Sequence, residues 1–133
     1  MKYKKLTFLT KGDENGSLIA LEENKNIPFE IKRVYYIFDT KEGVRRGFHA
    51  HKSLEQALIC VNGSCDILLD DGKEKSIMKL ENRNEGIHLK KLIWHEMFNF
   101  SADCVLMVLA SDLYCEEDYI RNYEEFLNYI GKY

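Results

Sequence analysis

One pair of histidines is the clearest indication of a chemical function in this sequence. His49 and His51 are two residues apart in a segment that we expect to be extended, so strand alternation points both side chains to one face. His95 stands alone further along the chain. Because imidazole exchanges protons near neutral pH and also binds metal ions, this spacing indicates either acid–base chemistry or a metal site.

Two short patterns around these histidines are similar to the two cupin motifs. The first motif is a glycine, a His-x-His pair, a glutamate and a closing glycine, and the second is a histidine followed four residues later by an asparagine. The matching residues are Gly47, His49, His51, Glu55 and Gly63 for the first motif, and His95 and Asn99 for the second. Because the strands that carry these motifs in a small barrel face inward, we expect them to converge on one pocket.

Three interpretations of the histidines stay open from spacing alone. They are ordinary polar residues on a strand, because short motifs have many chance matches. Alternatively, His49, His51, Glu55 and His95 form a three-histidine, one-carboxylate set suited to Fe, Mn, Ni or Zn. In the third interpretation, a histidine acts as acid and base without a metal.

The elements that must position these residues are mostly short strands. Asn15-Gly16 and Asn62-Gly63 are hairpin-turn dipeptides between apolar runs, and strands at this close spacing are typical of a sandwich or barrel. We expect an all-β fold with extended segments at 5–9, 17–21, 31–38, 45–51, 54–61, 64–70, 73–80, 87–93, 96–100 and 103–110.

The end of the sequence has a different periodicity. The apolar residues between Tyr119 and Ile130 repeat at helical spacing, and the acidic residues Glu116, Glu117 and Asp118 precede them, as is favourable at a helix start. The sequence therefore predicts one C-terminal helix whose apolar face packs on the strands.

Composition limits the classes of function. The chain has 133 residues, which favours a single domain over residues 1–133, and its net charge of −3 without a basic cluster argues against general nucleic-acid binding. We find no signal peptide and no apolar run of membrane-spanning length, so we expect a cytoplasmic protein. No two of the four cysteines form a CxxC pair, so the spacing does not indicate structural zinc, and Cys60 and Cys104 lie in apolar runs like small core residues.

Longer motifs resemble a known enzyme family. The segments 31–37, 46–52, 58–64, 94–97 and 118–123, which include Arg-Gly-Phe-His-Ala-His-Lys and Trp-His-Glu-Met, resemble the dTDP-4-keto-6-deoxyglucose 3,4-ketoisomerases. These are sugar-nucleotide cupins of bacterial surface-polysaccharide pathways, where they serve the biosynthesis of dTDP-linked deoxyaminosugars. The resemblance extends from about residue 16 to residue 129.

The resemblance implies a fold, a partner and a set of site residues. It implies a cupin β-sandwich that works as a homodimer with exchanged N-terminal strands, and catalysis with no metal or other cofactor. By position in the motifs, it makes His49 and His51 the catalytic pair, with His49 as our first choice of base, and it places Tyr35 at the sugar. Arg33 and Arg46 suit the diphosphate, because guanidinium groups match phosphate oxygens.

The resemblance also bears on the product. His95 in Trp-His-Glu-Met is similar to the members that make dTDP-3-keto-6-deoxy-D-galactose, whereas members that make the gluco epimer have arginine there. Galacto-type members can carry arginine where this chain has Asn15, and we take both His95 and Asn15 as further substrate-binding residues. The alternatives are a metal-dependent cupin enzyme, a 3,5-epimerase and a non-catalytic protein that binds sugar nucleotides.

Overall fold

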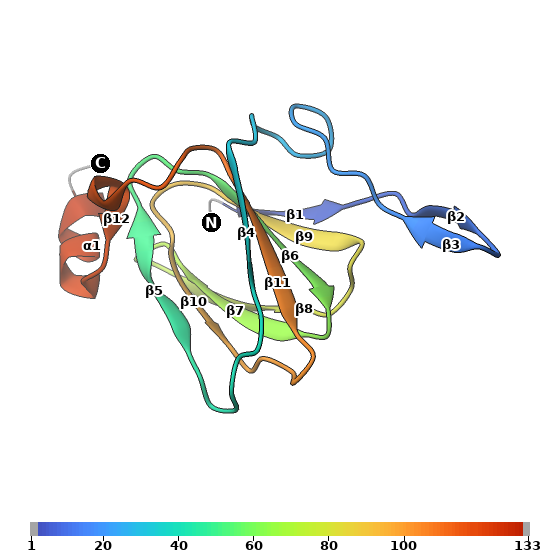
Figure 1. Cartoon of the computed structure of the whole chain (residues 1–133). Coiled ribbons are helices and arrows are strands. Elements are labelled where there is room, and N and C mark those ends of the chain that lie inside the picture. Colours follow the sequence, from blue (N-terminus) through green and yellow to red (C-terminus); the bar gives the residue numbers. More distant parts are fainter. Residues whose placement is uncertain (1–2, 132–133) are drawn as a thin grey trace.

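Two facing five-stranded sheets form the body of the protein in a computed structural model that describes residues 3–131 (Figure 1). One sheet has the strand order β1-β9-β6-β11-β4 and the other has β12-β5-β10-β7-β8, while β2 and β3 form a separate hairpin. The elements are β1 (Tyr3–Thr7), β2 (Lys11–Asp13), β3 (Gly16–Leu18), β4 (Arg33–Ile37), β5 (Arg46–His51), β6 (Gln56–Asn62), β7 (Cys65–Asp70), β8 (Lys75–Leu80), β9 (Glu85–Leu89), β10 (Trp94–Phe98), β11 (Val105–Ala110), the 3-10 turn η1 (Glu116–Asp118), β12 (Tyr119–Ile120) and α1 (Tyr123–Ile130).

The main core lies between the two sheets. In β7, alternate residues Cys65, Ile67 and Leu69 are fully buried, as expected for a strand with one face on the core. Strand β6 is different, because five consecutive residues from Gln56 to Cys60 are buried. Its outer face is covered by a second apolar cluster that includes Ile27 and Phe29, from the segment before β4. The all-β prediction is therefore confirmed, with one sheet buried on both faces at its centre.

Both predicted hairpin turns are present. Asn62-Gly63 joins β6 to β7, and Gly63 has a positive φ of 70°. The turn at Asn15-Gly16 joins β2 to β3, but this hairpin projects away from the two sheets, on the opposite side of the body from α1 (Figure 1).

The predicted C-terminal helix starts later than expected. Tyr119 and Ile120 are extended in β12, which pairs with His51 and Ala50 of β5, and the helix covers only Tyr123–Ile130. Glu116, Glu117 and Asp118 form a 3-10 turn rather than the first turn of the helix. Helical periodicity was misleading here because the pairing of β12 satisfies the backbone groups along the edge of β5.

Helix α1 has a clear start and a single apolar anchor. The side chain of Asn122 accepts a hydrogen bond from the Glu125 N–H, as an N-cap does. Phe126 is fully buried against Trp94 and Ile120. Within residues 3–131, no helix is both long and apolar enough to cross a membrane.

Strand β5 approaches β10 closely at Gly47. The pairing register of these strands shifts between His95 and Glu96, and Gly47 has a φ of 92° opposite this shift. A Cβ atom at Gly47 would lie 2.8 Å from the backbone oxygen of His95. A glycine is therefore required here both by conformation and by space, and it fixes how the two histidine-bearing strands meet.

We predict that Gly47→Ala destabilises the fold more than Gly43→Ala. Both glycines have positive φ, so in both variants an alanine must adopt the left-handed backbone conformation, which costs about 1–2 kcal/mol of folding free energy. Only Gly47 also meets backbone atoms, because nothing lies within 4 Å of a Cβ at Gly43. We expect a further loss on the order of 1–3 kcal/mol at Gly47, measured by urea unfolding. Equal losses in the two variants would contradict this account of the β5–β10 contact.

Candidate active site

Three histidines meet where β5 pairs with β10. His49 lies directly opposite His95 in the register, and His51 is on the same face of β5 as His49. The ring centroid of His49 lies 5.1 Å from that of His51 and 4.6 Å from that of His95. His51 and His95 are buried and His49 is partly buried. The structure thus brings together the three histidines that the sequence singled out.

Hydrogen bonds determine which nitrogen of each ring carries the proton. The Nδ1 of His49 lies 3.0 Å from the Gly47 carbonyl oxygen, and the Nδ1 of His95 lies 3.2 Å from the Ile93 carbonyl oxygen. Because a carbonyl oxygen only accepts, Nδ1 donates in both rings. The Nε2 of each neutral ring is therefore the nitrogen with a free lone pair.

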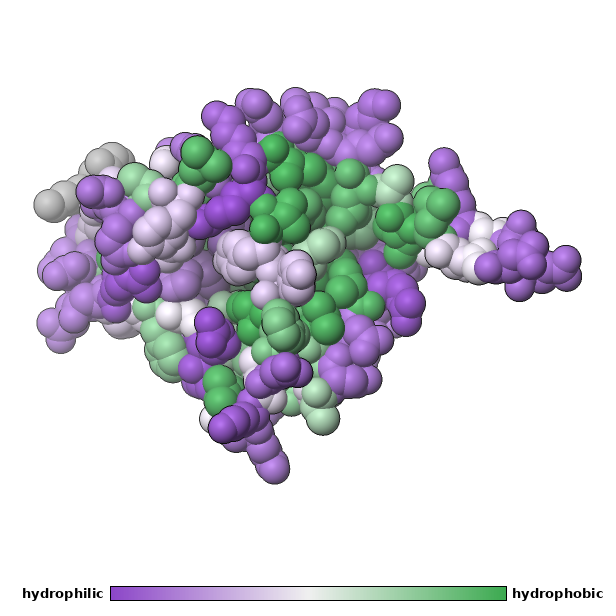
Figure 2. Space-filling model, in the orientation of Figure 1, coloured by the Kyte–Doolittle hydropathy of each residue, from purple (hydrophilic) through white to green (hydrophobic). Residues whose placement is uncertain are grey.

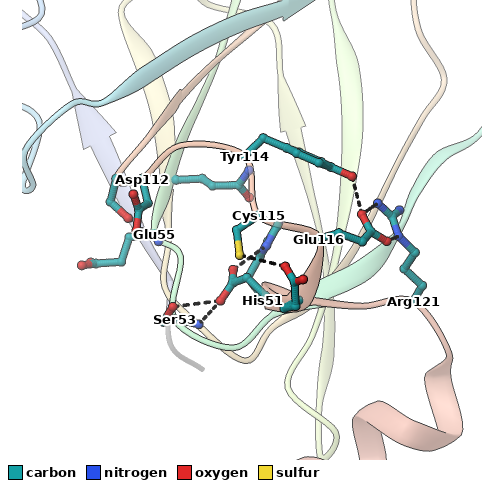
Figure 3. A network of polar contacts seen from close by, with 12 residues as sticks. His51, Ser53, Glu55, Asp112, Tyr114, Cys115, Glu116 and Arg121 are labelled. Atoms are coloured by element: carbon teal, nitrogen blue, oxygen red, sulfur yellow. Dashed lines mark hydrogen bonds and ion pairs between the residues drawn. The ribbon is translucent and has the colours of Figure 1, made fainter.

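His51 is oriented by a carboxylate instead of a carbonyl group. Its Nδ1 donates to Asp118 Oδ2 at 3.0 Å, while Asp118 Oδ1 accepts from the backbone N–H and the hydroxyl of Ser53, both at 2.8 Å. Figure 3 shows these contacts of His51 and Ser53. The Nε2 of His51 is buried and has no hydrogen-bond partner among the described residues. This arrangement leaves Nε2 free to accept a proton, with a carboxylate placed to stabilise the resulting imidazolium.

Asp118 was not predicted as a site residue. Three consecutive acidic residues before an apolar periodic segment are typical of a helix start, and Asp118 was placed there for that reason. The contact to His51 spans 67 positions, so no local pattern could reveal it. Tyr119 was missed as well: its ring packs against His49 and His51 at 5.0 and 4.4 Å between centroids.

Burial keeps the three imidazoles neutral. Loss of solvent is the largest cause of the lowered pKa of His49, and it also lowers the pKa of His51 to about 4, with the neighbouring His49 as the next cause. The Asp118 carboxylate opposes part of this shift at His51. Burial takes the pKa of His95 well below its ordinary value. The neutral rings each have a lone pair that can accept a proton, and at His51 the Asp118 carboxylate offsets part of the cost of protonation in this buried site.

Tyr35 of β4 contributes a hydroxyl group to the same region. Burial is the main cause that raises the pKa of Tyr35, so its phenol remains a hydrogen-bond donor. Its oxygen accepts a hydrogen bond of 3.3 Å from Gln56 Nε2, which leaves the phenol proton available. Gln56 is buried on β6 and was not singled out in the sequence.

Two cavities open onto these side chains. The larger is a cleft of about 660 Å³ that includes Tyr35, His49, Arg33 and Arg46 in its wall. The smaller, of about 290 Å³, includes His51 and Asp118, and Arg33 and Tyr119 line both. His95 is buried behind His49 and lines neither cavity.

Arginines give the larger cleft a positive wall. Arg45 and Arg121 are engaged in ion pairs of 2.7 Å with Glu96 and Glu116. Between residues 3 and 131, Arg33 and Arg46 form no ion pair, and the buried Nε of Arg33 has no hydrogen-bond partner. These two guanidinium groups are therefore available for an anionic group of a ligand.

Two residues expected near the histidines lie elsewhere. Glu55 is hydrogen bonded to His88 at 2.8 Å and is not part of the histidine cluster, so it does not complete the four-ligand set of the alternative metal interpretation. Asn15 is at the exposed tip of the β2–β3 hairpin and does not approach the histidines of its own chain. The cupin-type spacing of Glu55 was misleading because β6 begins only at Gln56, beyond this residue.

Without Glu55, the set still contains His49, His51 and His95, whose ring nitrogens are close enough together to bind one metal ion. One ring nitrogen each from His49, His51 and His95 lie within 4.8 Å of one another. Imidazole nitrogens suit Zn, Cu, Fe and Ni. The same atoms equally suit proton transfer, so the geometry alone is compatible with both chemistries.

Comparison with known proteins gives consistent results. The family model FdtA: WxcM-like, C-terminal matches residues 1–131. A TDP-4-oxo-6-deoxy-alpha-D-glucose-3,4-oxoisomerase of Aneurinibacillus thermoaerophilus is 57% identical over 132 residues, which are 99% of this chain and 95% of that protein. A 3,4-ketoisomerase of Helicobacter canadensis has a crystal structure with a TM-score of 0.96 and 54% identity, covering 98% of each chain.

A third relative was crystallised with a ligand. It is a mutant 3,4-ketoisomerase of Thermoanaerobacterium thermosaccharolyticum in complex with TDP-4-keto-6-deoxyglucose. Its structure has a TM-score of 0.95 and 42% identity to this chain, and the match covers 98% of this chain and 94% of the relative.

We predict that this histidine cluster makes the fold sensitive to mild acid. Below the ordinary histidine pKa of about 6.5, the unfolded chain binds protons that folded His51, with a pKa of about 4, does not bind. The free energy of unfolding should therefore fall as the pH drops from about 6.5 to 4, by on the order of 1–3 kcal/mol from His51. Urea unfolding at several pH values measures this change. In His51→Asn the decline should be shallower, and an equally steep decline would contradict the assignment.

Proposed function

Because the chain belongs to the FdtA, WxcM-like C-terminal family, we propose that it is a sugar-nucleotide 3,4-ketoisomerase. It converts dTDP-4-keto-6-deoxy-D-glucose into a 3-keto-6-deoxyhexose that stays linked to dTDP. The observation that carries this conclusion is the 57% identity, across nearly the whole chain, to an enzyme named for this reaction. The histidine centre can transfer the protons that such a reaction requires, and the cationic cleft beside it can bind the diphosphate.

We propose His51 as the base. The reaction removes the proton on C3, which the neighbouring C4 carbonyl acidifies, and the electrons of the C–H bond form a C3–C4 double bond. Two features support His51: an unpartnered Nε2 and a carboxylate on Nδ1. The hydrogen bonding of His49 is weaker support, because a neutral carbonyl stabilises an imidazolium less than a carboxylate does. This refines the expectation from sequence, which favoured His49.

Tyr35 is the proposed donor to the sugar oxygen that gains negative charge. When the C3 proton leaves, O4 becomes an enolate oxygen, and a phenol proton can stabilise it. Its protonated phenol and its place in the wall beside His49 support this role. O4 takes up a proton to become the C4 hydroxyl, the O3 hydroxyl loses its proton, and a second proton returns to C4, which gives the 3-ketone. The reaction is internally balanced and consumes no oxidant or reductant.

Arg33 and Arg46 are the proposed ligands of the diphosphate. Both line the cleft and neither is neutralised by an ion pair within residues 3–131. Arg33 also lies over the Tyr35 ring, 5.3 Å from its centroid, which connects the proposed diphosphate site to the proposed sugar site. The relative crystallised with TDP-4-keto-6-deoxyglucose supports a nucleotide-sugar ligand.

We propose the galacto product, dTDP-3-keto-6-deoxy-D-galactose. The configuration depends on which face of the enediol receives the proton at C4. His95 is the residue whose identity suggests the galacto face, and it lies behind His49, at 4.6 Å between centroids. We therefore expect His95 to act through His49, by holding its ring, rather than by touching the sugar.

A homodimer is part of the proposal. Figure 2 shows an apolar area over the middle of the visible face of the body, which extends towards the base of the projecting hairpin. Outward-facing side chains of β4, including Val34, Tyr36 and nearby Phe38, are 51–63% exposed. A second copy would cover this surface, and exchange of N-terminal segments would bring Asn15 of one chain towards the cleft of the other.

To test the function, the protein is incubated with dTDP-4-keto-6-deoxyglucose in D₂O and the sugar is followed by NMR. In D₂O we expect deuterium at C4 of a 3-keto product, and in a parallel reaction in H₂O the H4–H5 coupling of the product identifies the galacto or gluco configuration. His51→Asn should lose both turnover and exchange at C3, with a decrease of at least about 10³-fold, because the free base is gone.

His49→Asn serves as the matched control, because it removes an imidazole from the same strand. It should retain measurable exchange at C3. Near-normal turnover of His51→Asn would exclude it as the base. Deuterium at C5 would indicate a 3,5-epimerase instead, and activity that is lost with chelator and restored by metal would indicate a metal enzyme.

We predict that Val34→Glu separates the dimer. A carboxylate on the outer face of β4 would be buried without a partner in the interface, which is costly. Sedimentation equilibrium should show at least about tenfold weaker association than in the unchanged protein. Ile77→Glu is the control, because Ile77 is 60% exposed on β8 of the other sheet, and it should leave association unchanged. If both variants associate equally well, this face is not the interface.

A further inference from the structure

Three cysteines that are distant in sequence meet inside the main core. Cys60 is on β6, Cys65 is on β7 and Cys104 precedes β11, and each is at most 2% exposed. Their Sγ atoms all lie within 4.8 Å of one another, with 3.5 Å between Cys60 and Cys104. We propose that these three sulfurs form a binding site for a divalent, thiolate-preferring metal ion such as Zn²⁺. The proposal does not depend on the isomerase activity.

The sulfur spacing suits a metal ion. Zinc–sulfur bonds of about 2.3 Å around one ion place the sulfurs about 3.8–4.0 Å apart. The separation of 3.5 Å between Cys60 and Cys104 is slightly shorter than that value, and the other two separations are at most 4.8 Å. Small side-chain rotations would therefore be enough to gather the three sulfurs around an ion. The sequence spacing argued against structural zinc only because the contacts come from neighbouring strands and not from one loop.

The Cys60 thiol donates a hydrogen bond of 3.1 Å to the Asn62 carbonyl oxygen, at the start of the β6–β7 turn. The three sulfurs would supply three of the four ligands that zinc takes in a tetrahedral site. Binding converts thiols to thiolates, so up to three protons pass to solvent for each ion bound.

Charge favours a divalent ion over a monovalent one. Three thiolates with Zn²⁺ leave one net negative charge, whereas the same thiolates with Cu⁺ leave two, and burying unpaired charge is costly. The surrounding core residues, such as Leu58 and Leu106, are apolar and offer no compensating cation. Retention of one proton on a thiol would make the divalent site neutral.

Ordered polar contacts hold the loop that covers the cluster. Ser101 Oγ accepts a hydrogen bond from the Ser64 N–H and donates one to Asp103, and Asn62 Nδ2 donates to the Asp103 carbonyl. Ala102 and Asp103 in this loop are exposed, whereas the next residue, Cys104, is buried, so the cluster lies at the end of the core that this loop covers.

The cysteine site is separate from the histidine centre. Cys65 is four residues along β7 from Leu69, which pairs with His95. A strand rises about 3.3 Å per residue, which places the two sites roughly 13 Å apart along the sheet. Metal bound at one site is therefore not in contact with the ligands of the other.

The test is a titration of the intact protein with Co²⁺ without oxygen, in a buffer with a thiol-free reductant. Cobalt bound by thiolates gives an intense sulfur-to-metal charge-transfer absorption that imidazole ligands do not give. We expect this absorption to reach its limit at one ion per chain and to disappear when Zn²⁺ is added. Cys65→Ala and Cys104→Ala should each weaken Co²⁺ binding at least tenfold.

Two control variants identify the site. Cys115→Ala removes the exposed cysteine and should leave the charge-transfer absorption unchanged, as should His49→Asn. If unchanged protein shows no such absorption, the proposal is wrong, whether or not the cysteine variants fold. Absorption that persists in both core cysteine variants, or that disappears in Cys115→Ala, would equally overturn it.

Discussion

The pairing of β12 with β5 is the contact on which the site depends. It places Tyr119 opposite His51 and, one residue earlier, brings the Asp118 carboxylate to the imidazole. The same pairing covers the free edge of β5, so a single interaction gives both a satisfied sheet edge and an oriented histidine. Helix α1 then fixes β12 from behind, through Phe126 against Ile120.

A second constraint comes from the other side of β5. The close approach at Gly47 and the register shift next to His95 set the distance between the two histidine-bearing strands. The short ring separations follow from that distance, and so does the burial that lowers the histidine pKa values. Backbone geometry thereby controls the protonation of the centre: strands further apart would admit water and return the imidazoles to ordinary basicity.

Much of this structure could be predicted from the sequence, and the parts that could not share a cause. Turn dipeptides such as Asn62-Gly63 and alternating strands are local signals, and the motif that contains His49 and His51 is local as well. Long family motifs added Tyr35, Arg33 and Arg46, which the structure places in one cleft. Asp118, Gln56 and the cysteine cluster were not identified, because each depends on contacts between distant strands. The position of β12 was also mistaken, because a pairing partner outweighed helical periodicity.

The order of events during synthesis follows from the 67 positions between His51 and Asp118. A ribosome delivers β5 long before it delivers the carboxylate, so the early strands can pair while the histidine still lacks its orienting partner. Contacts of such long sequence separation form late, because closing the intervening chain costs entropy. The sheets themselves close over similar separations, 69 positions between Ile37 and Leu106 and 86 between Tyr3 and Leu89. The oriented imidazole therefore forms together with the completed sheets, and chemical competence comes only with the complete fold.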